Sequence, residues 1–170
     1  GSGLGTSAAM GVALVGALGR ATGVPDDTKA TAETAVALET EELRILSGKQ
    51  DHYASTLGGA QFMTFDGPDV TTTRLPLSPE ATAELRRRVV LVYTGHSRLS
   101  SDLHEHVVGR FEARDAGLLA TLREIAAIAH DARDALVAGS AGELARCVAA
   151  NWECQKALYP GITTDEIETL

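Results

Sequence analysis

Several residue types that mark particular classes of protein are scarce in this chain. Its 170 residues include only 2 cysteines, and 4% of them are aromatic. Cys147 and Cys154 lie in a segment predicted to be helical, roughly 10 Å apart along the axis, which is too far for a disulfide bond within that helix. The sequence also lacks a Cys-x-x-Cys pair and a histidine cluster, which argues against a structural zinc site. We therefore expect free thiols, as in a cytoplasmic protein.

Positive charge and long apolar runs are also in short supply. The chain has 15 Lys and Arg against 23 Asp and Glu, for a net charge of −8 at pH 7. Nucleic acid and anionic membranes are therefore not expected as main partners, although a local positive dipole can still hold a nucleotide. The apolar run from Ala8 to Leu18 is too short and too glycine-rich to span a bilayer, and it lacks the basic flank of a signal peptide.

What the sequence does contain is a glycine-rich beginning. Gly1, Gly3 and Gly5 alternate, and Thr6 and Ser7 then lead into a helix-forming segment. Glycine lets the backbone turn sharply and approach a ligand closely, and a helix N-terminus offers unpaired N–H groups and a positive dipole. Together these features predict a phosphate-binding loop. The lysine of a P-loop is missing, and Thr6 stands where the dinucleotide fingerprint requires glycine.

The hydrophobic pattern predicts an α+β fold with few strands. A helix is expected from Thr6 to Gly19 or Gly23, followed by a second one, capped by Asp26 or Asp27, that runs to about Leu46 and stops at Ser47-Gly48. The remaining expected elements follow in chain order: a hairpin of Gln61–Phe65 and Val70–Leu75, a short helix from Ser78, a buried strand over Val89–Tyr93, helices over Ser100–Phe111 and Asp115–Ala138, a helix opened by a capping box of Ser140 and Glu143, and a last helix capped by Thr163 or Thr164.

The glycine loop resembles the second motif of the GHMP kinases, which phosphorylate small molecules with ATP. This resemblance implies that the loop binds the ATP phosphates through Gly1, Gly3, Leu4, Gly5, Thr6 and Ser7. It also implies a Mg²⁺ site made by the Ser7 hydroxyl and an acid on the following helix, for which Glu39 is the best candidate. The alternative is that Glu39 is a solvated helix acid, as we expect for Glu41 and Glu42.

Gly48-Lys-Gln-Asp-His-Tyr53 resembles a second family segment, in the form typical of the D-glycero-D-manno-heptose-7-phosphate kinase branch. The resemblance gives Asp51 the role of catalytic base or orienting anion at the acceptor hydroxyl. Because the ordinary pKa of aspartate is near 3.9, orientation can matter more than proton abstraction. Lys49, Gln50 and Tyr53 are expected near the substrate. His52 departs from the pattern, which has glutamine there.

Two further segments match the same branch. Val89–Arg98 resembles a Leu-Leu-Tyr-Thr-Gly-x-x-Arg segment, and it makes Tyr93 and Arg98 candidate substrate contacts. The alternatives are a core or rim tyrosine and a salt-bridge arginine. Asn151-Trp152 and Leu158–Ile162 resemble an Asn-Trp…Leu-x-Pro-Gly-Ile segment, in which Trp152 is most simply a core anchor.

The family implies a half that resembles ribosomal protein S5 domain 2, expected over residues 1–85, and a ferredoxin-like half, expected over 86–170, with the fold incomplete at both ends. The implied reaction is ATP-dependent phosphorylation of a sugar, at the anomeric hydroxyl of a heptose 7-phosphate. The alternatives are another sugar-1-kinase of the fucose or galactose type and a non-catalytic remnant. The first and third family motifs do not occur in these 170 residues. We therefore expect the chain to be a fragment, or to begin with a cloning remnant, and to have little or no kinase activity alone.

Overall fold

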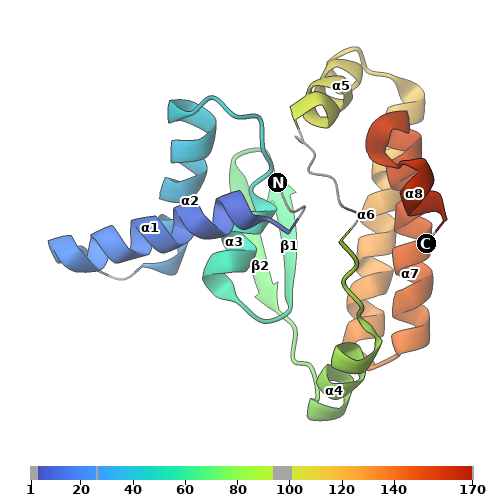
Figure 1. The fold of residues 1–170 in the computed structure, drawn as a ribbon, viewed down its shortest axis with the longest axis horizontal. Coiled ribbons are helices and arrows are strands. Elements are labelled where there is room, and N and C mark those ends of the chain that lie inside the picture. The colour runs from blue at the N-terminus through green and yellow to red at the C-terminus, as the bar shows by residue number, and fades with distance from the viewer. Residues whose placement is uncertain (1–3, 26, 94–100, 170) are drawn as a thin grey trace. The chain divides into compact units, whose positions relative to one another are not determined.

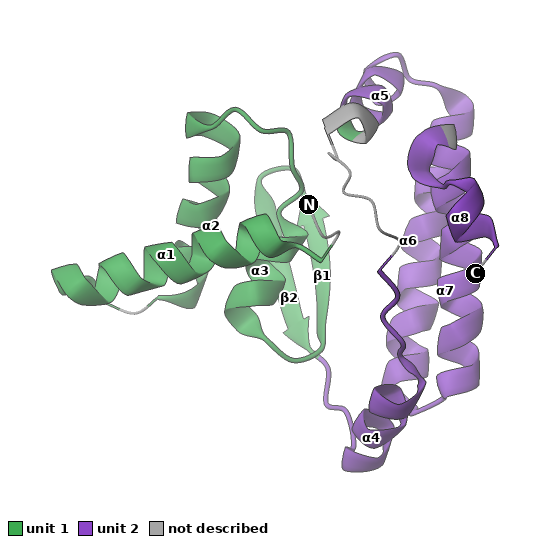
Figure 2. Ribbon diagram, viewed as in Figure 1, with its two compact units in different colours: residues 1–74, 97–104 green, residues 75–96, 105–170 purple. Residues whose placement is uncertain are grey.

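The structure is a computed structural model that describes residues 4–25, 27–93 and 101–169 (Figure 1). The chain divides into two compact units, which Figure 2 distinguishes by colour. Unit 1 contains residues 1–74 and 97–104, and unit 2 contains residues 75–96 and 105–170. The described part is mostly helical and has one small sheet, so the predicted α+β class is confirmed. The two predicted family half-folds and their boundary at residue 85 stay predictions.

The first two helices of unit 1 begin and end largely where the sequence predicts. Helix α1 spans Thr6–Thr22 and ends at Gly23, whose positive φ of 74° suits a glycine cap. Helix α2 spans Thr28–Ala37, and the Asp27 side chain accepts hydrogen bonds from the first-turn N–H groups of Lys29 and Ala30. Asp26 lies outside the described residues.

The predicted end of the second helix is wrong. Helix α2 continues as a π-helical segment, Leu38–Glu42, and stops before the predicted Leu46. The N–H of Leu43 closes the last wide turn on the carbonyl of Leu38, and Arg44 then takes a left-handed φ of 54°. A left-handed residue just past a helix ends it, because the chain can no longer continue the helical hydrogen bonds.

The next segment contains one element that the sequence analysis missed and one that it predicted. The missed element is helix α3, Gln50–Leu57. Strands β1, Gln61–Asp66, and β2, Asp69–Arg74, form the predicted antiparallel hairpin. Gly67 lies in the two-residue turn of this hairpin and has a φ of 56°. Residues with a side chain rarely adopt this backbone conformation, so the turn favours glycine.

The core of unit 1 lies where helices α1, α2 and α3 pack on one another (Figure 1). Small residues allow the helices to approach closely. A Cβ at Gly11 of α1 would lie 3.9 Å from that of Ala35 in α2. The buried residues of this core are Ala8, Ala32, Ala35, Val36, His52 and Tyr53.

Unit 2 is built around a pair of long antiparallel helices, α6 and α7, which turn back on each other at Gly139 (Figure 1). Gly139 takes a left-handed φ of 68° at this turn. The helices that unit 2 contains wholly or in part are α4 Pro79–Arg88, α5 Ser101–Glu112, α6 Ala116–Val137, α7 Ala141–Leu158 and α8 Asp165–Glu168, with a 3-10 turn at Pro160–Ile162. As predicted, Ser78 caps α4, and Thr164, one of the two predicted candidates, caps α8. Asp115 was predicted as the first residue of the long helix, and it caps α6 instead.

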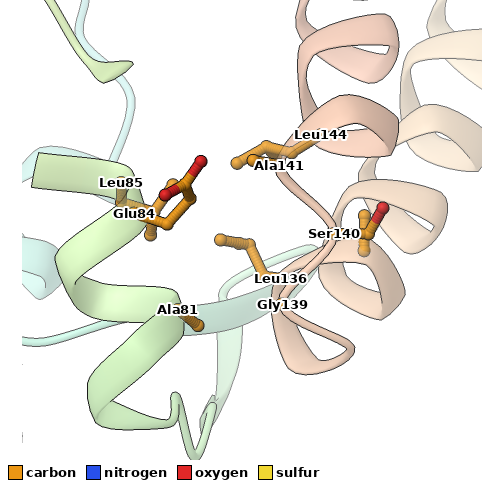
Figure 3. Close-up of a pocket in the computed structure, with 9 residues that line it drawn as sticks. Ala81, Glu84, Leu85, Leu136, Gly139, Ser140, Ala141 and Leu144 are labelled. Carbon is orange, nitrogen blue, oxygen red and sulfur yellow. The ribbon is translucent and has the colours of Figure 1, made fainter. Parts of the chain in front are cut away.

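Helix α4 packs beside the α6–α7 turn, and Figure 3 shows the small pocket between them. Its volume is about 10 Å³, room for one water at most. A Cβ at Gly139 would already touch Ala81 at 3.5 Å. This pocket is therefore a small gap between packed helices and not a ligand site.

Two expectations for unit 2 are wrong. Residues 89–93 form no strand, and their exposed fractions run from 53% to 77%. A strand is stable only when its backbone groups are paired, and in the described part of the chain the only sheet is β1–β2, which does not include them. The capping box is also not formed, because the Ser140 side chain accepts no cap hydrogen bond and Glu143 pairs with Arg146 instead.

Candidate functional site

The candidate site lies at the N-terminus of α1 in unit 1. Gly5 is the residue before this helix, and it adopts the left-handed conformation with φ 64° and ψ 25°. Its carbonyl accepts the N–H of Ala9, which starts the helical hydrogen bonds. Leu4, Thr6 and Ser7 are exposed, while Gly1 and Gly3 of the predicted phosphate loop lie outside the described residues. This end of α1 carries the positive end of the helix dipole, which favours an anion.

Asp51 lies directly against Gly5. A Cβ built on Gly5 would lie 2.9 Å from Cγ and 3.0 Å from Oδ2 of Asp51. Asp51 is in the first turn of α3, so the N-termini of α1 and α3 meet here. The N-terminus of each helix stabilises nearby negative charge. At α3 that charge is the Asp51 carboxylate, and at α1 the exposed loop leaves room for an anion.

Ser7 and Glu39 are in direct contact although they are 32 residues apart. The Ser7 hydroxyl donates a hydrogen bond of 3.1 Å to Oε1 of Glu39. Glu39 belongs to the π-helical segment that follows α2. Such segments are uncommon in proteins, but those that occur are often found at functional sites.

His52 completes the group from the other side of Glu39. Its Nε2 lies 2.7 Å from Oε2 of Glu39, and only 1% of the residue is exposed. Because a carboxylate only accepts, Nε2–H is the donor. The sequence analysis did not anticipate this contact, since it treated His52 only as a departure from the family pattern.

Three predicted substrate contacts lie near Asp51 in sequence but differ in their surroundings. Tyr53 is 3% exposed, and its hydroxyl donates to Glu33 at 3.3 Å. Burial raises the pKa of Tyr53, and the Glu33 carboxylate raises it further. Lys49 is half-buried, and its Nζ donates to the carbonyl of Pro68 in the hairpin turn. Gln50 is exposed, and its side chain folds back over Gly48.

The remaining candidates are a tyrosine in unit 2, an arginine outside the described residues and two surface acids. Tyr93 belongs to unit 2 and is 74% exposed. Arg98 lies outside the described residues. Glu41 and Glu42 are exposed, as expected of surface acids. The structure therefore brings together Ser7 with Glu39, and Asp51 with the loop at Gly5.

The Ser7 hydroxyl and the Glu39 carboxylate are oxygen donors of the kind that Mg²⁺ takes in proteins. Ser7 Oγ and Glu39 Oε1 lie 3.1 Å apart, joined by their hydrogen bond. In the described part of the chain, no group of three or more His, Cys, Asp or Glu side chains could hold a metal. A single carboxylate with a hydroxyl suits Mg²⁺, which takes its other ligands from phosphates and water.

Comparison with known proteins finds a family model over part of this chain. The model of the GHMP kinases N terminal domain matches residues 1–59, the range that includes Gly5, Ser7, Glu39, Asp51 and His52. The resemblance to the GHMP kinases found in the sequence is therefore confirmed over these residues.

The individual relatives are sugar kinases. The chain is 32% identical over its whole length to a D-glycero-alpha-D-manno-heptose 7-phosphate kinase of Campylobacter jejuni. It is 27% identical to a bifunctional fucokinase/GDP-fucose pyrophosphorylase of Arabidopsis thaliana and, likewise, to an L-fucokinase/L-fucose-1-P guanylyltransferase of Bacteroides fragilis. The chain spans 50% of the Campylobacter protein and 16% and 18% of the other two. No described helix has the length and apolar character needed to cross a membrane.

Proposed function

We propose that this chain forms the ATP-binding and acceptor-activating part of a sugar kinase, which transfers the γ-phosphoryl group of ATP to a sugar hydroxyl. The observation that carries the proposal is the contact between Gly5 and Asp51. It holds a carboxylate that can orient an acceptor hydroxyl against the loop that can hold the phosphates. Phosphoryl transfer depends on positioning and charge stabilisation of this kind.

The residues around this contact divide the work. The backbone N–H groups of the loop, Gly1 to Ser7, bind the phosphate oxygens, helped by the dipole of α1. The Ser7 hydroxyl and the Glu39 carboxylate would hold Mg²⁺, which neutralises charge on the phosphates when bound. Asp51 accepts the hydrogen bond of the sugar hydroxyl, fixes its direction and stabilises its proton as the oxygen attacks.

For the acceptor we propose the anomeric hydroxyl of a heptose 7-phosphate, with Lys49, Gln50, Tyr53, Tyr93 and Arg98 as candidate contacts. The higher identity to the heptose 7-phosphate kinase, 32% against 27%, favours this substrate over fucose. A fucose- or galactose-type kinase and a non-catalytic remnant are the alternatives. We also propose a cytoplasmic location, which the two free cysteines support.

The test uses the protein encoded by the complete reading frame, incubated with Mg²⁺, ATP and one sugar at a time. D-glycero-D-manno-heptose 7-phosphate, L-fucose and D-galactose are compared by ADP release, and the product is identified by phosphorus NMR. We expect turnover with the heptose phosphate and a new anomeric phosphate signal. Turnover only with fucose or galactose would select the alternative substrates, and ADP release with none of the three would favour the remnant. The 170-residue chain, assayed in parallel, should show little or no transfer.

A further inference from the structure

We infer that His52 is a positioning residue that fixes the Glu39 carboxylate in the orientation that meets Ser7. Its consequence for metal binding rests on the proposed function, whereas the positioning itself does not. Nothing in the family resemblance gives His52 this task, because the pattern has glutamine at its place. The inference comes from the contacts that His52 makes.

The Glu39 carboxylate is held at both oxygens by two different elements. Ser7, in the first turn of α1, donates to Oε1 at 3.1 Å, and His52, in α3, contacts Oε2 at 2.7 Å. The Glu39 side chain is 13% exposed, and that of His52 is 2% exposed. Ser7 is exposed, so its hydroxyl faces competition from water, whereas the buried His52 contact is shielded. His52 is therefore the firmer of the two holds on Glu39.

The second ring nitrogen of His52, Nδ1, indicates that packing in the core is not the only role of this residue. His52 Nδ1 is buried and has no hydrogen-bond partner. An unpartnered buried polar atom is unfavourable, and an apolar side chain of similar size would avoid that cost. What the imidazole supplies and an apolar residue cannot is the Nε2–H group that reaches Glu39.

The His52 hydrogen bond matters because the side chain of Glu39 can otherwise change its orientation. Glutamate has three rotatable side-chain bonds, and Glu39 starts from a π-helical segment whose next residues leave the helix. With Oε2 fixed by His52, Oε1 stays beside Ser7 and keeps a lone pair for a metal ion. Contacts of this kind to a ligating side chain typically change metal affinity 10- to 100-fold when they are removed. Glutamine can place an amide N–H near the position of Nε2, which leucine cannot.

The first experiment asks only about geometry. Crystal structures of the protein of the complete reading frame are compared for the wild type, His52→Leu and His52→Gln, all without nucleotide or metal. We expect the Glu39 carboxylate to leave Ser7 in His52→Leu and to return to it in His52→Gln. Thr56→Val is the matched control, because the Thr56 hydroxyl donates to the His52 carbonyl within the same helix and is not one of the two hydrogen-bond donors described for the Glu39 carboxylate. An unchanged Ser7–Glu39 hydrogen bond in His52→Leu would overturn the inference. If His52→Leu does not crystallise, the side-chain carboxylate signal of Glu39 in carbon-detected NMR gives the same comparison.

The second experiment asks about the consequence. Affinity for Mn²⁺·ATP, with Mn²⁺ standing in for Mg²⁺, is measured by electron paramagnetic resonance on the protein of the complete reading frame. We expect a 10- to 100-fold loss in His52→Leu, with His52→Gln and Thr56→Val within about 3-fold of the wild type. Equal affinity in the wild type and His52→Leu would contradict the consequence. A wild type that does not bind Mn²⁺·ATP would instead contradict the proposed function, while the geometric comparison would still decide whether His52 positions Glu39.

Discussion

Gly5 and Asp51 touch across the junction of two helix N-termini: a Cβ at residue 5 would lie 2.9 Å from Cγ of Asp51. Gly5 also takes a φ of 64°, which costs a residue with a side chain about 1–2 kcal/mol. Glycine is thus required here for two independent reasons. The conformation of the loop and the position of the carboxylate depend on the same missing Cβ.

Gly5→Ala should therefore lower kcat/KM by about 10²-fold, because the new methyl group pushes Asp51 away and an ångström of misplacement is enough for such a loss. Gly16→Ala is the control. A Cβ there has no neighbour within 4 Å, so it should raise the free energy of unfolding by about 0.5–1 kcal/mol and leave kcat/KM unchanged. Comparable kinetics in the two variants would show that the Gly5–Asp51 contact is unimportant.

Asp51→Asn keeps the size of the side chain and removes its charge. We expect turnover of the complete protein to fall about 10²-fold or more, the range typical of a lost general base, with little change in ATP affinity. Asp66→Asn, at the exposed end of β1, is the control and should behave like the wild type. Full turnover by Asp51→Asn would remove Asp51 from the mechanism.

Asp115 should make unit 2 sensitive to acid. The Leu118 backbone N–H lowers the pKa of Asp115 below its ordinary value of 3.8, and the Arg110 side chain lowers it further. Because the pKa is lower in the folded state, this stabilisation is fully present above the ordinary pKa. It is lost as the pH falls through the folded value.

The measurement compares the melting temperatures of the wild type and Asp115→Asn from neutral to strongly acidic pH. Asparagine still accepts the cap hydrogen bond but carries no charge. The wild type should therefore be the more stable protein at neutral pH, and its advantage should disappear as the pH falls below the ordinary pKa of aspartate and through the lower pKa of the folded state. An advantage that stays constant over the whole range would show that the Asp115 charge contributes nothing.

The two cysteines should react at different rates. Cys154 is 6% exposed, and its burial raises its thiol pKa, with a further increase from Glu124. The thiolate is the reactive form, so a raised pKa lowers its amount at neutral pH. Cys147 is half-buried. Iodoacetamide labelling followed by mass spectrometry should find Cys147 modified first, and faster labelling of Cys154 would contradict the described packing of α7.

Helix starts were predictable because their signals are local. Asp27 and Ser78 cap helices through bonds to residues two or three positions ahead, and the sequence shows both ends of each interaction. Asp115, which was predicted only as the start of a helix, caps α6 in the same way. The same logic failed at Ser140, where Glu143 prefers a nearby arginine. The run over 89–93 has the apolar character of a strand, but strand formation requires a partner that no local pattern specifies.

The candidate site shows the same division. Its loop, Glu39 and Asp51 were predicted from family motifs, but their contacts join residues far apart in the chain. Glu39 lies in a π-helical segment and contacts Ser7, and no local pattern in the sequence indicates either feature. His52 could have been noticed because it replaces an expected glutamine beside Asp51. Its partner Glu39 could not have been found, because the pairing of α3 with the π-helical segment Leu38–Glu42 exists only in the folded protein.

The central claim is that Ser7 and Glu39 bind one magnesium ion, and a double-mutant cycle tests it most directly. The Mg²⁺ concentration that gives half-maximal activity is measured for the complete protein and for Ser7→Ala, Glu39→Gln and the double variant. Two ligands of one ion should be strongly non-additive, with a coupling of about 0.5–3 kcal/mol, so the double variant should be little worse than the poorer single one. Effects that add within about 0.5 kcal/mol, or single variants that need no more Mg²⁺ than the wild type, would contradict the claim.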